Sequence, residues 1–191
     1  MLKEIISDSA FWSSLLGFLI AGASTFALFW FQQRAERRNR ERNALNFLES
    51  NIESIIETIS ELQRARDHSD VIYFDLLDAI KSEVVTYNNT KPHLYVIGNR
   101  EIIRGAEKFV RDVFFFANRT YVMQNSLEDK RNILLSISKS KDDKIPSNTD
   151  VSDIKNQAES NYTAANRYCD NLKFKVSDGQ RVLADIRKAL R

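Results

Sequence analysis

The sequence predicts an all-α protein in which a single N-terminal transmembrane helix continues into a cytosolic bundle of four to five helices. Three observations support this fold class. The chain has 191 residues but only five glycines and two prolines, and so few helix breakers favour long helices. A run of twenty-two uncharged residues lies near the N-terminus. After this run, apolar residues recur at three- and four-residue spacing, as they do in amphipathic helices.

The transmembrane helix is predicted for residues 10–31, which read AFWSSLLGFLIAGASTFALFWF. At about 1.5 Å per residue this helix is roughly 33 Å long, which matches a hydrocarbon core of about 30 Å. Trp12 and Trp30 lie near its two ends, and indole rings favour the headgroup region of a bilayer. We expect the segment to be retained, because the apolar run continues well past the small residues 21–23 that resemble a signal-peptide cleavage site.

An arginine-rich collar, residues 32–43, follows the apolar run and sets the predicted orientation. It contains two glutamates and five arginines: Arg34, Arg37, Arg38, Arg40 and Arg42. Positively charged flanks stay on the cytoplasmic side of a membrane. We therefore expect residues 1–9 to form a short extracytoplasmic tail and residues 44–191 to form a cytosolic domain at the plasma (inner) membrane. Anionic lipid headgroups are the expected partner of the collar.

Two alternatives to this assignment are nucleic-acid binding by the collar and the reverse orientation in the membrane. Nucleic acid is not the expected partner, because Glu36 and Glu41 interrupt the arginines and no aromatic residue is interleaved with them. The reverse orientation stays open for a eukaryotic protein, since Asn88, Asn118 and Asn161 each begin a formal glycosylation sequon. Glycans at these sites would place the domain outside the cell.

The apolar run also carries small residues at a strict four-residue spacing: Ser13, Gly17, Ala21 and Thr25. Small side chains allow two membrane helices to approach closely, and hydroxyl groups can form hydrogen bonds across the contact. Because each chain has one span, the partner helix must come from another copy. The stripe therefore predicts a homo-oligomer.

A second periodic pattern begins directly after the collar. Its apolar residues alternate three- and four-residue steps over about three heptads: Leu45, Leu48, Ile52, Ile55, Ile59 and Leu62. This spacing is typical of a helix with one apolar seam. No glycine or proline lies between Phe31 and Leu62, so we expect the membrane helix to continue to about Arg66. We expect the seam to pack within its own domain.

Further helices are predicted for the rest of the domain, over residues 70–87, 99–125, 127–138 and 151–190. The helix over residues 99–125 contains Phe114-Phe115-Phe116 and is apolar almost all round there, which favours a central place in the bundle. The segment HLYVIG before it is expected to be a packed connector. Residues 139–150 are expected to form an exposed loop, and Asp178-Gly179 to kink or split the last helix.

No residue pattern typical of catalysis is present, so we expect neither an enzyme nor a cofactor. His68 and His93 have no second His or Cys at metal-ligand spacing, and Cys169 is the only cysteine. The glycines at 98 and 105 do not have the spacing of a phosphate-binding loop. Arg100 and Arg104 are the candidate contacts for an anion or ligand, because they lie near the expected start of a helix, where free N–H groups attract anions.

In outline the chain resembles membrane-anchored members of the HEPN class of small all-α ribonucleases in antiviral systems, which share an N-terminal anchor and a compact helical domain. Enzymes of this class use an Arg and a His with four to six residues between them, near a dimer interface. Here Arg64 lies four positions before His68 with only three residues between them, and nothing suitable precedes His93. The resemblance covers the architecture alone and transfers no residue.

Three functional hypotheses follow. The first is a non-enzymatic membrane effector, scaffold or oligomeric pore, in a bacterial defence or stress system, that assembles through the small-residue stripe and the helical domain. The second is a membrane-tethered sensor or binding module for a ligand or a cytosolic protein, which would need a polar pocket, for instance one lined by Arg100, Arg104 or Tyr162. The third is a HEPN-like ribonuclease.

Overall fold

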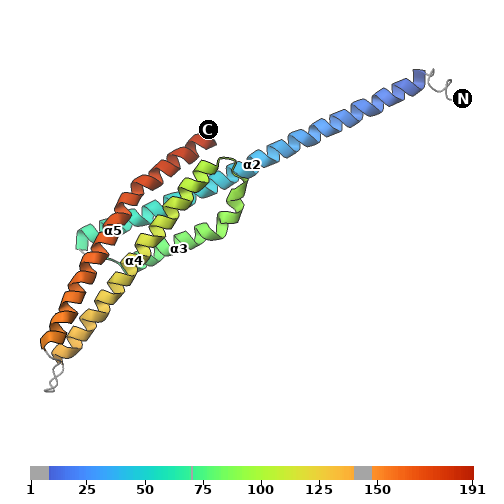
Figure 1. Cartoon of the computed structure of the whole chain (residues 1–191). Coiled ribbons are helices and arrows are strands. Elements are labelled where there is room, and N and C mark those ends of the chain that lie inside the picture. Colours follow the sequence, from blue (N-terminus) through green and yellow to red (C-terminus); the bar gives the residue numbers. More distant parts are fainter. Residues whose placement is uncertain (1–8, 70, 140–147) are drawn as a thin grey trace. The chain divides into compact units, whose positions relative to one another are not determined.

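The computed structural model describes residues 9–69, 71–139 and 148–191. Within these ranges it contains no strand, one 3-10 helix and four α-helices (Figure 1). The elements in chain order are α2 (Ser9–Ser69), α3 (Phe74–Thr90), the 3-10 helix η1 (Lys91–Val96), α4 (Arg100–Lys139) and α5 (Asn148–Leu190). The all-α fold class is confirmed. Of the predicted tail only Ser9 is described, and most of the predicted loop, residues 140–147, lies outside the described residues.

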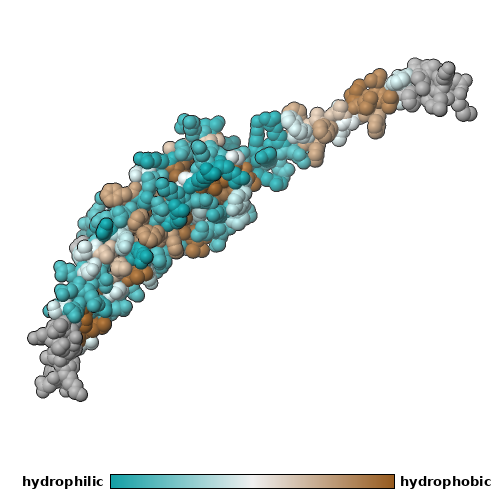
Figure 2. All heavy atoms as spheres, viewed as in Figure 1, coloured by the Kyte–Doolittle hydropathy of each residue, from teal (hydrophilic) through white to brown (hydrophobic). Residues whose placement is uncertain are grey.

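The chain divides into two compact units, Met1–Asn43 and Ala44–Arg191. In the first unit every residue from Trp12 to Phe31 is helical and exposed. Figure 2 shows apolar side chains along this helix, followed by hydrophilic ones at the collar. The rest of the chain therefore buries none of the residues from Trp12 to Phe31.

The second unit is a helical bundle around one apolar core. All six seam residues of α2 are buried and belong to this core, which confirms that the seam packs within its own domain. α4 packs along α5 and against α3, and Figure 1 shows α4 and α5 side by side as a long hairpin. The core combines the seam with residues of every other helix, among them Leu77, Tyr87, Leu94, Phe109 and Leu172.

The segment between α2 and α4 differs in part from the prediction. α3 begins at Phe74 and not at Asp70, because Tyr73 has an extended backbone (φ −83°, ψ 122°) and Ile72 packs into the core from outside the helix. The expected packed connector is confirmed. It forms η1, which begins with a proline in its first turn, where a missing N–H is tolerated, and it buries Leu94 and Ile97.

α4 is one continuous helix over the two predicted segments 99–125 and 127–138. The predicted break at Ser126 is wrong, because this polar side chain does not cap a new helix. Its hydroxyl oxygen accepts a hydrogen bond from Asn161 Nδ2 of α5 at 2.9 Å. The Phe114-Phe115-Phe116 stretch of α4 is not buried all round. Phe114 and Phe115 are exposed, whereas Val113 and Ala117 are buried.

α5 begins at Asn148 and runs through Asp178-Gly179 without interruption. The predicted split at this pair is therefore wrong, while the predicted kink stays a prediction. Gly179 is buried, and a Cβ atom there would lie 2.8 Å from Ile56 Cδ1 and from two ring atoms of Phe109. The glycine therefore permits α5 to approach α2 and α4 closely, and it does not break the helix.

Candidate functional site

The N-terminal helix is the first candidate site. It is long and apolar enough to cross a membrane, and none of its apolar stretch is buried. The core helix of a soluble protein would pass the same test of length and composition, but it would be buried by the rest of its chain. The exposure of this stretch therefore argues against a soluble core helix.

Six residues of this helix surround a shallow groove. Three small residues line it, Ala21, Gly22 and Thr25, together with three phenylalanines: Phe18, Phe26 and Phe29. We call this surface the phenylalanine groove. The Thr25 hydroxyl donates a hydrogen bond to the Ala21 carbonyl of its own helix at 2.8 Å. Its proton is therefore not free to form a hydrogen bond with a second helix. A second helix would meet the groove mainly by close packing.

The groove takes up only half of the predicted small-residue stripe. Ala21 and Thr25 lie in it, whereas Ser13 and Gly17 do not. Successive helical residues are rotated by about 100°, so a strict four-residue spacing drifts by about 40° at each step. Ser13 precedes Gly22 by nine residues and thus lies on the opposite side of the helix, and the stripe winds out of the groove toward its N-terminal end.

The end of the apolar stretch and the collar make several polar contacts within the helix. The Arg34 guanidinium lies over the Trp30 ring, 5.2 Å from its centroid. Arg40 forms an ion pair with Glu36 one turn earlier. Arg37, Arg38 and Arg42 are exposed as well, so all five arginines of the collar are at the surface.

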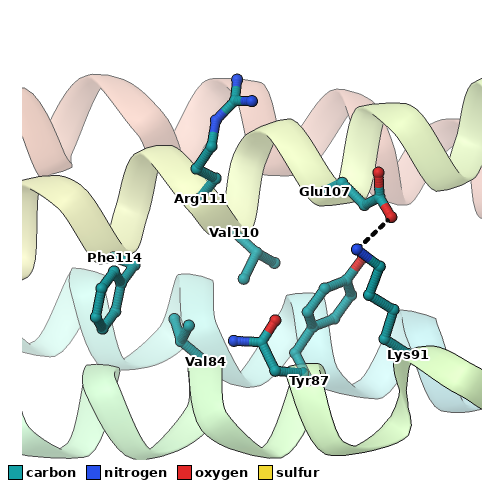
Figure 3. A pocket seen from close by; sticks show the side chains of 8 residues that line it. Val84, Tyr87, Lys91, Glu107, Val110, Arg111 and Phe114 are labelled. Atoms are coloured by element: carbon teal, nitrogen blue, oxygen red, sulfur yellow. Dashed lines mark ion pairs between the residues drawn. The ribbon is translucent and has the colours of Figure 1, made fainter.

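The second candidate site is a cavity of about 290 Å³ between α3, η1 and α4 (Figure 3). We call it the Tyr87 cavity. Its apolar lining comes from Val84 of α3 and from two residues of α4, Val110 and Phe114. Its polar lining consists of Tyr87, Asn88, Lys91, Glu107 and Arg111. The cavity therefore has an apolar half and a polar half.

An ion pair closes the polar half of the Tyr87 cavity. Lys91 Nζ and Glu107 Oε1 are 2.9 Å apart, and their side chains are 41% and 38% exposed. The hydrogen bond to Glu107, and the negative charge of this residue, raise the pKa of Lys91 above its ordinary value. Both side chains remain partly accessible to solvent.

The Tyr87 hydroxyl is the unusual atom of this site. Tyr87 is only 2% exposed, and among the described residues its hydroxyl has no hydrogen-bond partner. Burial, and to a lesser degree the charge of Glu107, raise the pKa of Tyr87 far above its ordinary value, so the group stays neutral. An unpaired buried hydroxyl costs about 1–3 kcal/mol, so this one is a candidate contact for a ligand.

The predicted ligand contacts lie elsewhere. Arg100 and Arg104 are exposed in the first turns of α4 and do not line the Tyr87 cavity. Tyr162 is half-buried on α5, also away from it. The start of α4 is capped by Asn99, whose Oδ1 accepts the Glu101 N–H at 3.0 Å, so an amide oxygen already occupies this end.

Sequence reasoning missed the cavity because Lys91 and Glu107 belong to different helices. The available signal was Tyr87, which continues the apolar face of α3 through Ile80 and Val84. A tyrosine on a buried face needs a partner for its hydroxyl group. A buried tyrosine hydroxyl group without an evident partner was therefore the signal for this cavity.

The two histidines and the cysteine lie on three different elements, His68 on α2, His93 on η1 and Cys169 on α5. His68 and His93 are exposed on different elements. Cys169 is buried, and burial raises the pKa of its thiol although Arg66 and Gln63 oppose this effect. In the part of the chain that the structure describes, no group of three His, Cys, Asp or Glu side chains could hold a metal ion.

Comparisons of this chain with known protein families, with curated proteins and with solved structures give no match. A function must therefore rest on the residues and geometry described above.

Proposed function

We propose that this chain is a single-pass membrane protein that self-assembles and acts as a non-enzymatic membrane effector, scaffold or oligomeric pore. The observation that carries the proposal is the uncharged helical stretch from Trp12 to Phe31, every residue of which is exposed. Transfer of such an apolar surface from water to lipid is strongly favourable. A bilayer supplies the environment that the rest of the chain does not provide.

The arginine collar supports an orientation with the N-terminus outside and the helical domain in the cytosol. Each Lys or Arg close to an anionic leaflet is worth about 1 kcal/mol, and positive flanks are retained on the cytoplasmic side. Trp30 and Arg34 contact each other. In this orientation the indole ring of Trp30 would lie at the headgroup level and the guanidinium group of Arg34 would face the aqueous phase.

Orientation is tested by fusing alkaline phosphatase or a fluorescent protein to the C-terminus in a bacterial host. Alkaline phosphatase is active only outside the cytosol, so we expect an inactive phosphatase and a fluorescent reporter. Replacing the five arginines of the collar by glutamine should weaken this preference. An active phosphatase fusion in the unaltered chain would overturn the orientation.

Self-assembly is proposed to use the phenylalanine groove. Gly22 and Ala21 allow a second helix backbone to approach, and a Cβ atom at Gly22 or Gly17 would meet nothing within 4 Å in its own chain. Leucine at either glycine would therefore not strain the chain, and any change in assembly would report on contacts between copies.

The experiment is chemical cross-linking and light scattering of the full chain in detergent and in nanodiscs. We expect Ala21→Leu and Gly22→Leu to reduce the oligomer, whereas the matched control Ala27→Leu, which lies outside the groove, leaves it unchanged. Gly17→Leu separates the two geometries, since it would act only if the four-residue stripe is the contact. An oligomer that survives all four substitutions would exclude the membrane helix as the interface.

A second function, a membrane-tethered sensor or binding module, is favoured by one specific observation, the Tyr87 cavity with its unpaired hydroxyl group. This function is compatible with assembly in the membrane. In a sensor, the helical domain would bind the ligand in the Tyr87 cavity and the membrane helix would form the assembly.

A further inference from the structure

We propose that the Tyr87 cavity binds a small zwitterion with an apolar side group, namely an α-amino acid with a branched or aromatic side chain. This inference rests on the binding-module function and is independent of assembly through the membrane helix. It is argued from the three parts of the cavity: a buried hydroxyl group, a pair of opposite charges and an apolar wall.

The buried hydroxyl group requires a polar ligand atom. Tyr87 points from α3 toward α4 and ends beside Lys91 and Glu107 (Figure 3). A phenol can both donate and accept a hydrogen bond, and in the described part of the chain this one does neither with a protein partner. A purely apolar ligand would leave it unsatisfied, so a ligand that fits the cavity places a polar atom there.

The two charges of the cavity favour a ligand that carries both signs. An ammonium group has three donors and a carboxylate has about four acceptor sites, so Lys91 and Glu107 retain capacity beyond the contact at 2.9 Å that joins them. Glu107 would repel a simple anion, and Lys91 would repel a simple cation. A zwitterion satisfies both, with its carboxylate at Lys91 and its ammonium group at Glu107.

Arg111 does not shift this balance toward an anion. It contributes to the lining, but in Figure 3 its guanidinium group points away from Tyr87 and the ion pair. The charge presented to a ligand is therefore that of Lys91 and Glu107 together, which is close to zero.

The other half of the cavity fits the apolar part of the ligand. Val84 and Val110 are buried, while Phe114 is 41% exposed and has a face that a ligand could cover. At about 290 Å³, the cavity is near the lower end of the range for small-molecule sites. A single amino acid suits this volume better than a nucleotide or a peptide.

The test is isothermal titration calorimetry of the full chain in detergent micelles. The probes are L-phenylalanine and L-leucine, together with N-acetyl-L-phenylalanine, which lacks the ammonium group, and L-phenylalaninamide, which lacks the carboxylate. We expect at least one amino acid to bind at low millimolar concentration or below. Each blocked analogue should bind about tenfold or more weakly, as expected for the loss of one charged hydrogen bond.

Variants connect the binding to the cavity. Tyr87→Phe keeps the ring and removes only the hydroxyl group, and it should weaken binding about tenfold, as should Glu107→Gln. The matched control is Asp78→Asn, which removes the ion pair of Asp78 with Lys81, away from the cavity, and should leave affinity unchanged.

Two results would overturn the proposal in different ways. If a blocked analogue binds as tightly as the amino acids, and Tyr87→Phe weakens it, the binding module stands and the zwitterion is excluded. If no probe binds, or if Tyr87→Phe and Glu107→Gln leave binding intact, the cavity is not the binding site, and the binding-module function loses its support as well.

Discussion

Gly179 lies so close to Phe109 that a Cβ atom at this position would be 2.8 Å from the ring atoms Cε2 and Cζ. Real Cβ atoms do not approach other carbons this closely, so only glycine fits without movement of the ring. The Phe109 ring is buried in the core and cannot swing into solvent. This contact fixes the closest approach of α5 to α4.

Gly179→Ala should destabilise the protein although alanine is the better helix former. Alanine gains about 1 kcal/mol of helix propensity, but overpacking against a buried ring costs about 1–3 kcal/mol. We expect a net loss in the free energy of unfolding. Guanidinium unfolding of the full chain in mild detergent, followed by circular dichroism, measures it.

Gly105 provides the matched control because it also lies inside a long helix. A Cβ atom there would be 3.5 Å from Val182 Cγ2, which is an ordinary contact. Gly105→Ala should therefore stabilise the protein by about 0.5–1 kcal/mol. If Gly179→Ala stabilises the protein as much as Gly105→Ala does, the close approach at Gly179 has no energetic role.

The same glycine shows what the sequence could and could not predict. The apolar seam of α2 was predictable, since its spacing places every member on one face, and all six members are buried. Glycine inside a helix has two meanings, a break or a close contact. The positions of Ile56 and Phe109, both far earlier in the chain, distinguish the two.

The candidate sites show the same limit. The small residues of the N-terminal helix were visible in the sequence, but a rotation of about 100° per residue selects Ala21, Gly22 and Thr25 for the groove and leaves Ser13 outside. The Tyr87 cavity depends on the packing of α3 against α4, because Lys91 and Glu107 are not neighbours on any one helix. No local pattern carries this information.

Tyr87→Phe should make the ligand-free protein more stable. The variant removes a buried hydroxyl group that is unpaired among the described residues, and it leaves the ring in the core. Relief of this desolvation should raise the free energy of unfolding by about 1 kcal/mol. The control is Tyr95→Phe, because Tyr95 is 60% exposed and its hydroxyl group stays hydrated. Unchanged or lower stability of Tyr87→Phe would show that the hydroxyl group is satisfied.

Stability should fall at alkaline pH, and Tyr87 should account for part of the fall. Its folded-state pKa lies above the ordinary value of 10.0 because the group is buried. Between pH 10.0 and the raised folded-state pKa, the Tyr87 hydroxyl group has lost its proton in the unfolded chain and keeps it in the folded chain. The unfolded state then binds fewer protons, so stability decreases as the pH rises. Its contribution is fully present below pH 10 and is lost above it, at up to about 1.4 kcal/mol per pH unit.

The measurement is the free energy of unfolding between pH 8 and pH 11 for the unaltered chain and for Tyr87→Phe. We expect the variant to have the shallower alkaline slope, and Tyr95→Phe to keep the original one. Identical slopes for all three proteins would mean that Tyr87 ionises normally in the folded state.

Lys175 of α5 contacts two carboxylates, Asp112 of α4 and Asp178 of its own helix. Its Nζ donates hydrogen bonds to Asp112 Oδ2 and to Asp178 Oδ2, both at 3.0 Å, and the hydrogen bond to Asp112 is the main cause of its raised pKa. Lys175→Met would leave both carboxylates without this shared cation, and the Asp112 side chain is only 25% exposed. We expect a loss of about 1–2 kcal/mol, between the values for exposed and buried ion pairs.

Arg111 is the control for this substitution because it approaches the same carboxylate. Its Nε is 3.8 Å from Asp112 Oδ1 and its side chain is 76% exposed, so Arg111→Gln should change stability by less than about 0.5 kcal/mol. In high salt the small effect of Arg111→Gln should vanish, while most of the Lys175→Met effect should remain, since half-buried pairs are screened less. Equal effects for the two substitutions would show that only the net charge near Asp112 matters, and that the hydrogen bond from Lys175 of α5 to Asp112 of α4 does not.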